Sequence, residues 1–372
     1  MIHRKIKTAC LVSVMALNLS ACNYDNSTEP SQPAPEAVQP AASVTLVDGK
    51  YVVNQTIPTF SDYIIIETQM GNVAPRVVDL EETLDDLAAY DVIFMGEAHG
   101  HVASHLMQTK SFAGLYARSK DKKLALSMEQ FERSQQNIMD QYLAGEIGEQ
   151  VLRDDGKAWD HYRSSYRPTV EFAKRYGLSV IAAEVPAGMV SCVGEEGPAF
   201  LDRLEGEPRS WIADELHTQD GPYKIKYLDF LKKAAGHNVS DPNLTEEQKE
   251  EKRFKSFAAQ VSRDDTMAMS MFDYLKVNPG TQIMHTNGSF HSAGLLGTVE
   301  RLKMRNPNLK LANVHSILVD DPDNVSFDAD LVGEGQYLLL IQPTPKNFVK
   351  MENINKFIER TKGAIDKNLC SY

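Results

Sequence analysis

The chain has 372 residues, a formal net charge of −12 at pH 7 and 42% hydrophobic residues. Such an acidic surface repels nucleic acid and anionic lipid headgroups, so nucleic acid is not an expected partner. The length and apolar content allow one large domain, or one domain with a sizeable insertion, to bury a full core.

The N-terminus has the pattern of a bacterial lipoprotein signal. Basic residues Arg4, Lys5 and Lys7 precede the apolar run Ala9–Leu19. That run is too short to span a membrane, because a spanning helix needs ~20 apolar residues. It ends in Leu-Ser-Ala-Cys, which is typical of a lipobox. We therefore expect residues 1–21 to be a signal peptide and Cys22 to be lipidated; an ordinary secretory signal is the alternative.

Residues 22–43 predict a disordered tether between the lipid and the folded part. They are mainly Pro, Ser, Ala, Asn and Glu, a composition that does not bury a core. A coil of about 20 residues keeps the domain within ~25 Å of the membrane. Asn23, not Asp, follows the lipidated cysteine, which by analogy with the enteric sorting rule indicates the outer membrane. The expected location is thus a membrane outside the cytoplasm.

The next part of the chain alternates short apolar runs with helical patterns. Several runs are continuously apolar, and ten or more residues separate most of them, which is typical of a largely parallel α/β sheet with helices on both faces. The predicted strands are Val44–Val53, Asp91–Met95, Leu124–Met128, Leu178–Ala183, Gln282–Thr286, Leu311–Val319 and Tyr337–Gln342. We expect residues 44–346 to form this α/β domain and residues 347–372 to add a C-terminal helix.

Strand patterns disappear from about residue 194 to residue 260. Helix-forming, highly charged sequence replaces them, with segments at 198–205, 223–235 and 246–260. This predicts a helical subdomain inserted into the α/β domain. Ordinary outer helices are the alternative, and the sequence does not separate the two.

Two strands are followed by a glycine and, three residues later, a histidine. Gly96 ends the first apolar run and precedes Glu97 and His99; Gly288 ends the second and precedes His291. Ligands of open α/β sheets bind at the carboxyl edge of the strands, where these side chains would project. The alternative is that each histidine only hydrogen-bonds a turn.

A third strand runs into Glu129, which would reach the same edge of the sheet. Glu97, His99, Glu129 and His291 could therefore converge, either to bind a divalent metal or to act as general acids and bases. For a metal, we expect Glu97, His99 and His291 as ligands.

Other polar residues have less clear roles. His101 and His105 lack the intervening glutamate of a zinc helix, so we expect them to lie on the surface. Arg263-Asp264-Asp265 precedes an apolar helix and would either cap it or line the site. In an oxidising compartment Cys192 and Cys370 could form a disulfide, and unpaired thiols are an equal alternative.

The motifs together resemble the ChaN-like lipoproteins, which are linked to haem binding and iron uptake, within the Tiki, TraB and erythromycin-esterase superfamily. The resemblance runs in chain order from about Asp91 to Val319. It is carried by Gly96-Glu97-Ala98-His99, Met128 to Gln136, Tyr142 to Glu146, Trp159, Tyr166-Arg167-Pro168, Phe172-Ala173, Ile181 to Ala183, Val185-Pro186, Arg263 to Ala268 and Gly288-Ser289-Phe290-His291. Two features depart from the family pattern: Glu184 where Asn is expected, and the charged segment Asn238–Arg253.

The resemblance implies a pocket floored by Glu97, His99, Glu129 and His291, with Gly96, Gly288, Arg263 and Asp264 around it. It also implies haem as a ligand, without naming the residue that binds iron. Haem iron takes His, Met, Cys or Tyr. The candidates in the helical part are Tyr162 and Tyr166 first, then His161, His217, Tyr223 and Tyr227.

Three functions follow from these expectations. The first is a lipid-anchored haem-binding protein that stores haem or passes it on, with a haem-delivery protein as partner and a homodimer as a further possibility. The second is a hydrolase in which the two glutamates and two histidines bind a metal or activate water. The third is a tethered interaction protein without a small ligand.

Overall fold

The computed structural model describes residues 42–68, 74–119, 123–235, 244–365, 370 and 372. The predicted signal peptide, Cys22 and nearly all of the predicted tether lie outside these residues, as do residues 238–243 of the charged segment. Residues 42–372 form one compact unit. Within the described residues, none of the helices has both the length and the apolar character needed to cross a membrane.

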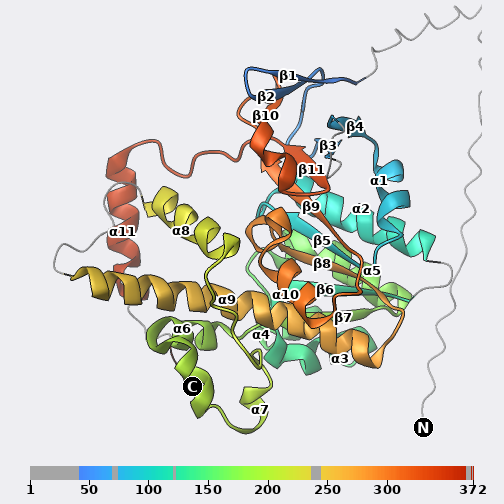
Figure 1. Ribbon diagram of the computed structural model, residues 1–372. Helices are drawn as coiled ribbons and strands as arrows, with labels where there is room; N and C mark the ends of the chain where they lie inside the picture. The colour runs from blue at the N-terminus through green and yellow to red at the C-terminus, as the bar shows by residue number, and fades with distance from the viewer. Residues whose placement is uncertain (1–41, 69–73, 120–122, 236–243, 366–369, 371) are drawn as a thin grey trace, which may run out of the picture. The chain divides into compact units, whose positions relative to one another are not determined.

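An eight-stranded sheet lies at the centre of this unit (Figure 1). Six neighbouring strands are parallel, and two antiparallel strands extend one edge. Their order across the sheet is β4 (Arg76–Val78), β3 (Tyr63–Glu67), β11 (Tyr337–Ile341), β9 (Leu311–Leu318), β5 (Val92–Glu97), β8 (Gln282–Gly288), β6 (Leu124–Glu132) and β7 (Ser179–Glu184). The predicted largely parallel α/β fold is confirmed.

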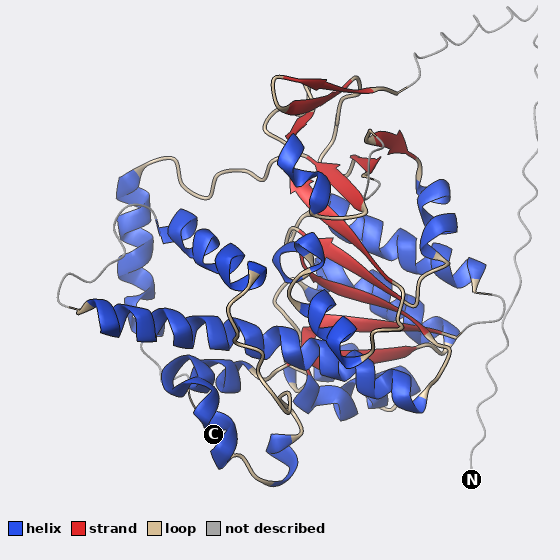
Figure 2. Cartoon of the chain, viewed as in Figure 1, coloured by secondary structure: helices blue, strands red, loops and turns tan. Residues whose placement is uncertain are grey.

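Helices cover both faces of the sheet, as Figure 2 shows. Alternate residues of β5 point to opposite faces, which explains why all four residues from Val92 to Met95 are apolar. Ile93 and Met95 face one core, and Val92 and Phe94 face the other. The first core involves α1 (Leu80–Leu87), α2 (Val102–Arg118), α3 (Gln136–Ala144), α4 (Glu149–Asp154) and α5 (Arg167–Tyr176). The second involves α9 (Glu246–Val277) and α10 (Thr298–Arg305). A strand buried on both faces needs apolar residues at every position.

The strand predicted at 44–53 is instead a hairpin of β1 (Val44–Val47) and β2 (Lys50–Val53). The chain reverses at Asp48-Gly49, where both residues have positive φ, and β10 (Ser326–Asp328) joins the hairpin in a small sheet. Asp-Gly is a turn signal that the apolar pattern concealed. The short strands β3, β4 and β10 were not predicted.

Between β7 and β8 the described residues contain helices and no strand. They form α6 (Ala187–Glu196), a 3₁₀ turn at Gly197–Arg203, α7 (Gly206–Arg209), α8 (Pro222–Ala235) and α9. The predicted subdomain, 194–260, falls inside this longer helical stretch. A separate apolar core joins α6, α8 and the N-terminal half of α9 through Val185, Phe200, Tyr223 and Phe257.

Helix α9 has 32 residues and begins with a capping box at Thr245. Arg263, Asp264 and Asp265 lie in its interior, so the capping interpretation of this trio is wrong. Asp264 and Asp265 are fully buried, and their neighbours are residues of the strand ends and the helical part.

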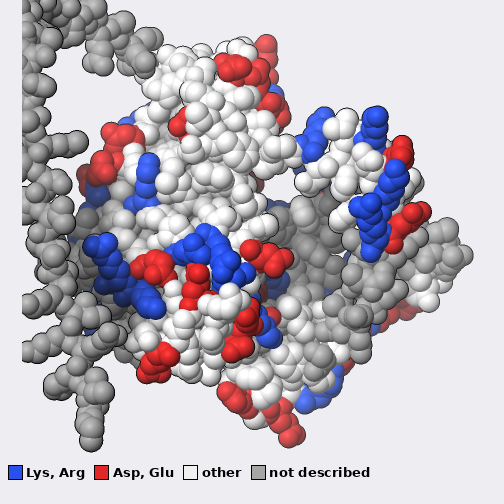
Figure 3. Space-filling model, turned by 180° about the vertical axis from the view of Figure 1, so that it is seen from behind, with Lys and Arg blue, Asp and Glu red and all other residues white. Residues whose placement is uncertain are grey.

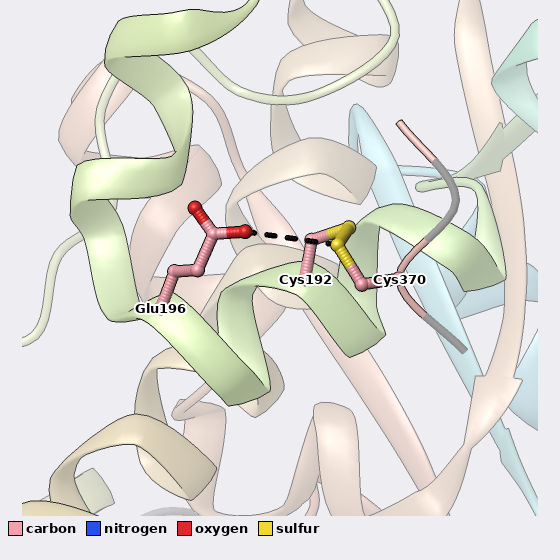
Figure 4. A group of neighbouring side chains, drawn as sticks. All are labelled: Cys192, Glu196 and Cys370. Carbon is pink, nitrogen blue, oxygen red and sulfur yellow. Dashed lines mark hydrogen bonds between the residues drawn. A yellow bond between two sulfur atoms is a disulfide. The ribbon is translucent and has the colours of Figure 1, made fainter. Parts of the chain in front are cut away.

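The C-terminal helix α11 spans Met351–Ile365. Beyond it, a disulfide joins Cys370 to Cys192 of α6, and the Glu196 carboxylate lies 3.7 Å from Sγ of Cys370 (Figure 4). Arg203 also donates a 2.7 Å hydrogen bond to the backbone oxygen of Tyr372. The end of the chain is therefore attached to the helical subdomain.

Candidate functional site

The candidate site lies where β5, β8 and β6 end side by side. Glu97 ends β5, Glu129 lies near the end of β6, and Gly288 ends β8. The ladder between β6 and β7 changes register after Met128, at the point where Glu129 turns into the site. His99 and His291 follow in the next turns, so the four residues expected to converge lie at one edge of the sheet.

Glu97 holds the imidazole of His99. The Nδ1 of His99 lies 2.7 Å from Oε1 of Glu97, which also accepts a 2.7 Å hydrogen bond from the Tyr166 hydroxyl. Gln108 donates to the other oxygen at 2.7 Å. Burial lowers the pKa of His99, but the hydrogen bond to Glu97 and the charge of Glu129 outweigh it, so the pKa is raised. Glu97 is an orienting group with all its contacts made inside the protein.

Asp264 holds His291 in the same way. Its Oδ1 lies 2.8 Å from Nδ1 of His291 and accepts a hydrogen bond from the Thr298 hydroxyl; its Oδ2 accepts one from Tyr223. Despite burial, the charges of Asp264 and Glu129 raise the pKa of His291. The site thus contains two imidazoles, those of His99 and His291, and the Nδ1 atom of each lies within hydrogen-bond distance of a carboxylate.

The carboxylate of Glu129 lies between these imidazoles. Its Oε1 is 4.0 Å from Nε2 of His99 and 3.9 Å from Nε2 of His291. The same oxygen accepts a 2.7 Å hydrogen bond from Arg263, and Oε2 accepts one of 2.6 Å from the Gly288 N–H. Burial raises the pKa of Glu129, but the charges of His291, Arg263 and His99 prevail and lower it to about 2. Glu129 is therefore a buried carboxylate anion.

Gly288 allows His99 this position. A Cβ at residue 288 would lie 2.7 Å from Nε2 of His99, a distance at which the ring or the strand has to move. Gly96 is also confined, since a Cβ there would lie 3.0 Å from the Val314 carbonyl oxygen. The two glycines of the repeated motif thus allow close approach of side chain and backbone.

Arg263 is shared by two buried carboxylates. Besides Glu129, it contacts Oε2 of Glu184 through Nη2 at 2.5 Å and through Nε at 2.9 Å. Burial raises the pKa of Glu184 above its usual value, even though Arg263 acts in the opposite direction. The departure from the family pattern at residue 184 therefore places a second acid on this guanidinium, which leaves Arg263 poorly suited to bind an anionic ligand.

The arrangement of Glu129 between His99 and His291 suits general acid and base chemistry on a small molecule such as water. The gaps of about 4 Å between Glu129 and the two Nε2 atoms exceed a direct hydrogen bond, and one oxygen atom between them could contact an imidazole and the carboxylate together. One imidazole would accept a proton while the other donates one.

The ligand atoms do not form a metal cluster. Among the residues that the structure describes, the one group of His, Cys, Asp or Glu atoms lying within 4.8 Å of each other is Cys192, Glu196 and Cys370, and its sulfurs are bonded together. Glu97, His99 and His291 are not such a group, and Glu97 contacts the Nδ1 side of His99. The proposed metal ligands would have to move toward each other to hold an ion.

His101 and His105 are buried, so the expectation that they lie on the surface is wrong. His101 accepts a hydrogen bond from the Ala103 N–H through Nδ1 and caps α2, and its Nε2 contacts the Gln342 carbonyl oxygen at 3.0 Å. His105 accepts from the Gly100 N–H and lies beside Gln108. Both support the loop that carries His99.

The haem-ligand candidates differ in exposure. Tyr162 and Tyr166 lie in a π-helical turn and are 0% and 2% exposed; burial raises the pKa of both phenols. Because iron binds tyrosine as phenolate and from an open side, neither residue suits this role in the described state. Tyr223 and Tyr227 are buried, and His217 contacts Asp265 at 2.8 Å. His161 is the exposed member of the set.

Several site residues were not anticipated. Gln108, Thr298 and Gln260 contact Glu97, Asp264 and His291, and Tyr166 supports Glu97 rather than iron. Gln108 and Thr298 lie on helices outside the motifs, whereas Gln260 lies just before Arg263 and Tyr166 is part of a motif; no local pattern indicates the contacts that these residues make. His99 also has a tryptophan neighbour, Trp159, at 5.2 Å between ring centroids.

Comparisons with known proteins bear on the family and the fold. The family model described as haem-binding uptake, Tiki superfamily, ChaN matches residues 83–302, more than half of the chain. The structure of ChaN of Campylobacter jejuni, described with cofacial haem binding, matches at 17% identity and a TM-score of 0.54, covering 76% of this chain and 97% of that chain. An erythromycin esterase in its open conformation matches at 14% identity and a TM-score of 0.38, covering 83% and 87%. No curated protein sequence matches the chain significantly.

Proposed function

Because the chain belongs to the haem-binding uptake, ChaN family of the Tiki superfamily, we propose that it is a haem-binding lipoprotein that stores haem or passes it on during iron acquisition. In this proposal Cys22 carries the lipid and holds the domain at a membrane outside the cytoplasm, with the outer membrane as its location. A haem-delivery protein would be its partner. Family membership is the observation that supports haem as the ligand.

His161 is our proposed axial ligand. It is exposed, and it lies two residues after Trp159, a half-buried aromatic side chain next to His99. A neutral imidazole with an open nitrogen binds haem iron, and an indole face suits a planar macrocycle. His99 is less suitable, since its raised pKa favours the protonated ring and its Nε2 points toward Gly288 and Glu129.

A haem titration tests this proposal. We expect the purified chain from Asn23 onward, which contains the whole compact unit, to give a sharp Soret band with a saturating stoichiometry. His161→Ala should broaden or shift that band and weaken binding, whereas Tyr176→Phe, on the exposed part of α5, should leave it unchanged. A broad band typical of unbound haem in the wild type would reject haem binding. An unchanged band in His161→Ala would reject only this axial ligand.

Hydrolysis is a second candidate, favoured by one observation. Two imidazoles with carboxylate-bound Nδ1 atoms face a single buried Glu129 oxygen, an arrangement that haem binding at the rim does not require. Such a centre suits the transfer of protons to and from water. Turnover of simple esters or amides that disappears in both Glu129→Gln and His291→Gln, with the fold intact, would support it. Equal, negligible turnover in all three proteins would count against it, and metal analysis of the same samples would show whether a divalent ion takes part.

A further inference from the structure

A hollow lies between helix α10 and the start of β9, and none of the residues that line it belongs to the candidate site. Its volume is about 440 Å³, within the range of pockets that take small organic ligands. Its walls are mainly apolar and are formed by Tyr90, Leu295, Val299, Leu309 and Leu311. All of these except Tyr90 belong to the core under α10 or pack against it, so the apolar core of this face continues into the walls of the hollow.

Leu295 contributes to the wall from a strained backbone. Its φ of 56° lies in the left-handed region, which bulky side chains rarely adopt. The turn is held on both sides of this residue, because the Gly294 N–H donates to the Glu334 carbonyl oxygen at 2.9 Å and the Leu295 N–H donates to that of Ser292 at 3.1 Å. Strain of this kind persists where the surrounding structure enforces it, and it is frequent at ligand-binding sites.

Two lysines lie at the rim of the hollow. Lys303 on α10 and Lys310 before β9 are both exposed. Lys303 donates a 2.8 Å hydrogen bond to the Leu309 carbonyl oxygen, and among the residues that the structure describes no carboxylate pairs with either lysine. The acid of the rim, Glu300, is engaged by Arg301 at 2.6 Å. The rim therefore offers two positive charges that neighbouring acids do not neutralise.

The opposite face of the molecule differs in this respect. In Figure 1, α10 lies in front of the sheet, and Figure 3 shows the molecule from behind, with basic and acidic side chains interspersed over much of the view. On the helices of that face, Arg118 pairs with Glu81 and Arg167 pairs with Glu149. A basic group with an acid beside it attracts an external anion less, so the rim beside α10 is the better place for one.

We propose that this hollow binds a small amphipathic carboxylate. An aliphatic or aromatic body would lie against the apolar walls, where removal of apolar surface from water favours binding. The carboxylate would lie at the rim, where Lys303 and Lys310 donate charge-assisted hydrogen bonds to it. A neutral apolar molecule leaves the lysines unused and a small inorganic anion leaves the walls in water, so a ligand with both parts fits best. The inference concerns a site separate from Glu129 and does not depend on haem binding.

Titration with octanoate tests the site. In the chain from Asn23 onward with ¹³C-labelled Leu and Val methyl groups, we expect saturable chemical-shift changes concentrated at Leu295, Val299, Leu309 and Leu311. 1-Octanol, which lacks the charge, should bind about tenfold more weakly, and acetate, which lacks the chain, should not shift these resonances. Absence of saturable octanoate binding, equal affinity for octanoate and 1-octanol, or shifts spread over other methyl groups would each overturn the proposal.

Matched variants separate the site from general surface effects. Lys310→Glu should weaken octanoate binding at least about fivefold, whereas Lys123→Glu, which reverses an exposed lysine before β6, should leave it unchanged. Leu295→Gly should weaken binding and keep the melting temperature of the wild type, because glycine adopts this backbone without strain. Met304→Ser, 58% exposed on α10, is the apolar control and should bind octanoate like the wild type.

Equal weakening in Lys123→Glu or Met304→Ser would overturn the proposal, because binding would then not depend on the hollow. So would a wild-type dimer in solution that Leu295→Gly or Lys310→Glu converts to a monomer, since a second copy of the chain would then occupy the hollow.

Discussion

Oδ1 of Asp264 lies 2.8 Å from Nδ1 of His291, so a residue inside a long helix sets the direction of an imidazole that follows a strand. The contact turns Nε2 toward Glu129, 3.9 Å away. Glu97 does the same for His99 from the opposite side. Glu97 and Asp264 therefore set the orientations of His99 and His291, and the two imidazoles direct their Nε2 atoms toward Glu129.

Asp264→Asn should lower the pKa of His291. The charge of Asp264 and its hydrogen bond both favour the protonated imidazole, and burial then acts with less opposition. An NMR titration of the His291 Hε1 resonance measures the change, and Glu352→Gln on exposed α11 serves as the control. A pKa of His291 that is the same in Asp264→Asn and wild type would contradict this account of the site.

Glu129 should stabilise the fold above about pH 4.5 and lose that effect in acid. Its pKa is about 2 in the folded protein against an ordinary 4.5, so the unfolded chain takes up the proton first as pH falls. We expect the difference in unfolding free energy between wild type and Glu129→Gln to shrink as pH falls from 4.5 toward 2. Denaturant unfolding at a series of pH values measures it, and a constant difference over this interval would show that Glu129 is not held as an anion.

Glu184→Asn should make the site receptive to anions. In the wild type, Arg263 is occupied by Glu184 and Glu129, whereas in the variant part of the guanidinium is released. Added sulfate or acetate should then raise the melting temperature of Glu184→Asn more than that of the wild type, because a ligand of the folded state stabilises it. Glu247→Gln, at an exposed position in the first turn of α9, is the control. Equal responses of all three proteins would indicate that Glu184 does not shield Arg263.

Loss of the Cys192–Cys370 disulfide should destabilise the protein by about 2–5 kcal/mol. The bond closes a long loop, and its removal enlarges the unfolded ensemble. Denaturant unfolding of Cys192→Ser with Cys370→Ser measures the cost. Reducing agent should destabilise the wild type to the level of the double variant and leave the double variant unchanged; equal stability of all four samples would contradict the prediction.

The large features of the fold could be predicted because they depend on local patterns. Each buried parallel strand is a short apolar run, and Gly96 and Gly288 mark where two of them end. The hairpin at 44–53 and the three-residue strands β4 and β10 escaped prediction. Asp48-Gly49 is a clear turn signal that the interpretation of 44–53 as one strand overlooked. Strands of three residues owe their structure to neighbours far along the chain.

The strand patterns indicated Glu97, Glu129 and His291, and the family resemblance indicated Arg263 and Asp264, but the contacts that the helices make in the site were not predicted. Strand order brings Glu97, Glu129 and His291 to one edge, and their position after apolar runs already indicates this. Gln108 contacts Glu97 and Asp264 contacts His291 because of the way α2 and α9 pack against the strand ends, and no short motif encodes this packing. His101 and His105 were misjudged for the same reason, since burial of a helix face depends on the elements that cover it.

Helix α9 is a single element about 48 Å long at the usual rise per residue. Its first turns belong to the end of the unit where α8 lies, and its middle carries Arg263 and Asp264. One continuous helix therefore contributes both to the core of the helical subdomain and to the contacts that hold Glu129 and His291, so the two regions share a structural element.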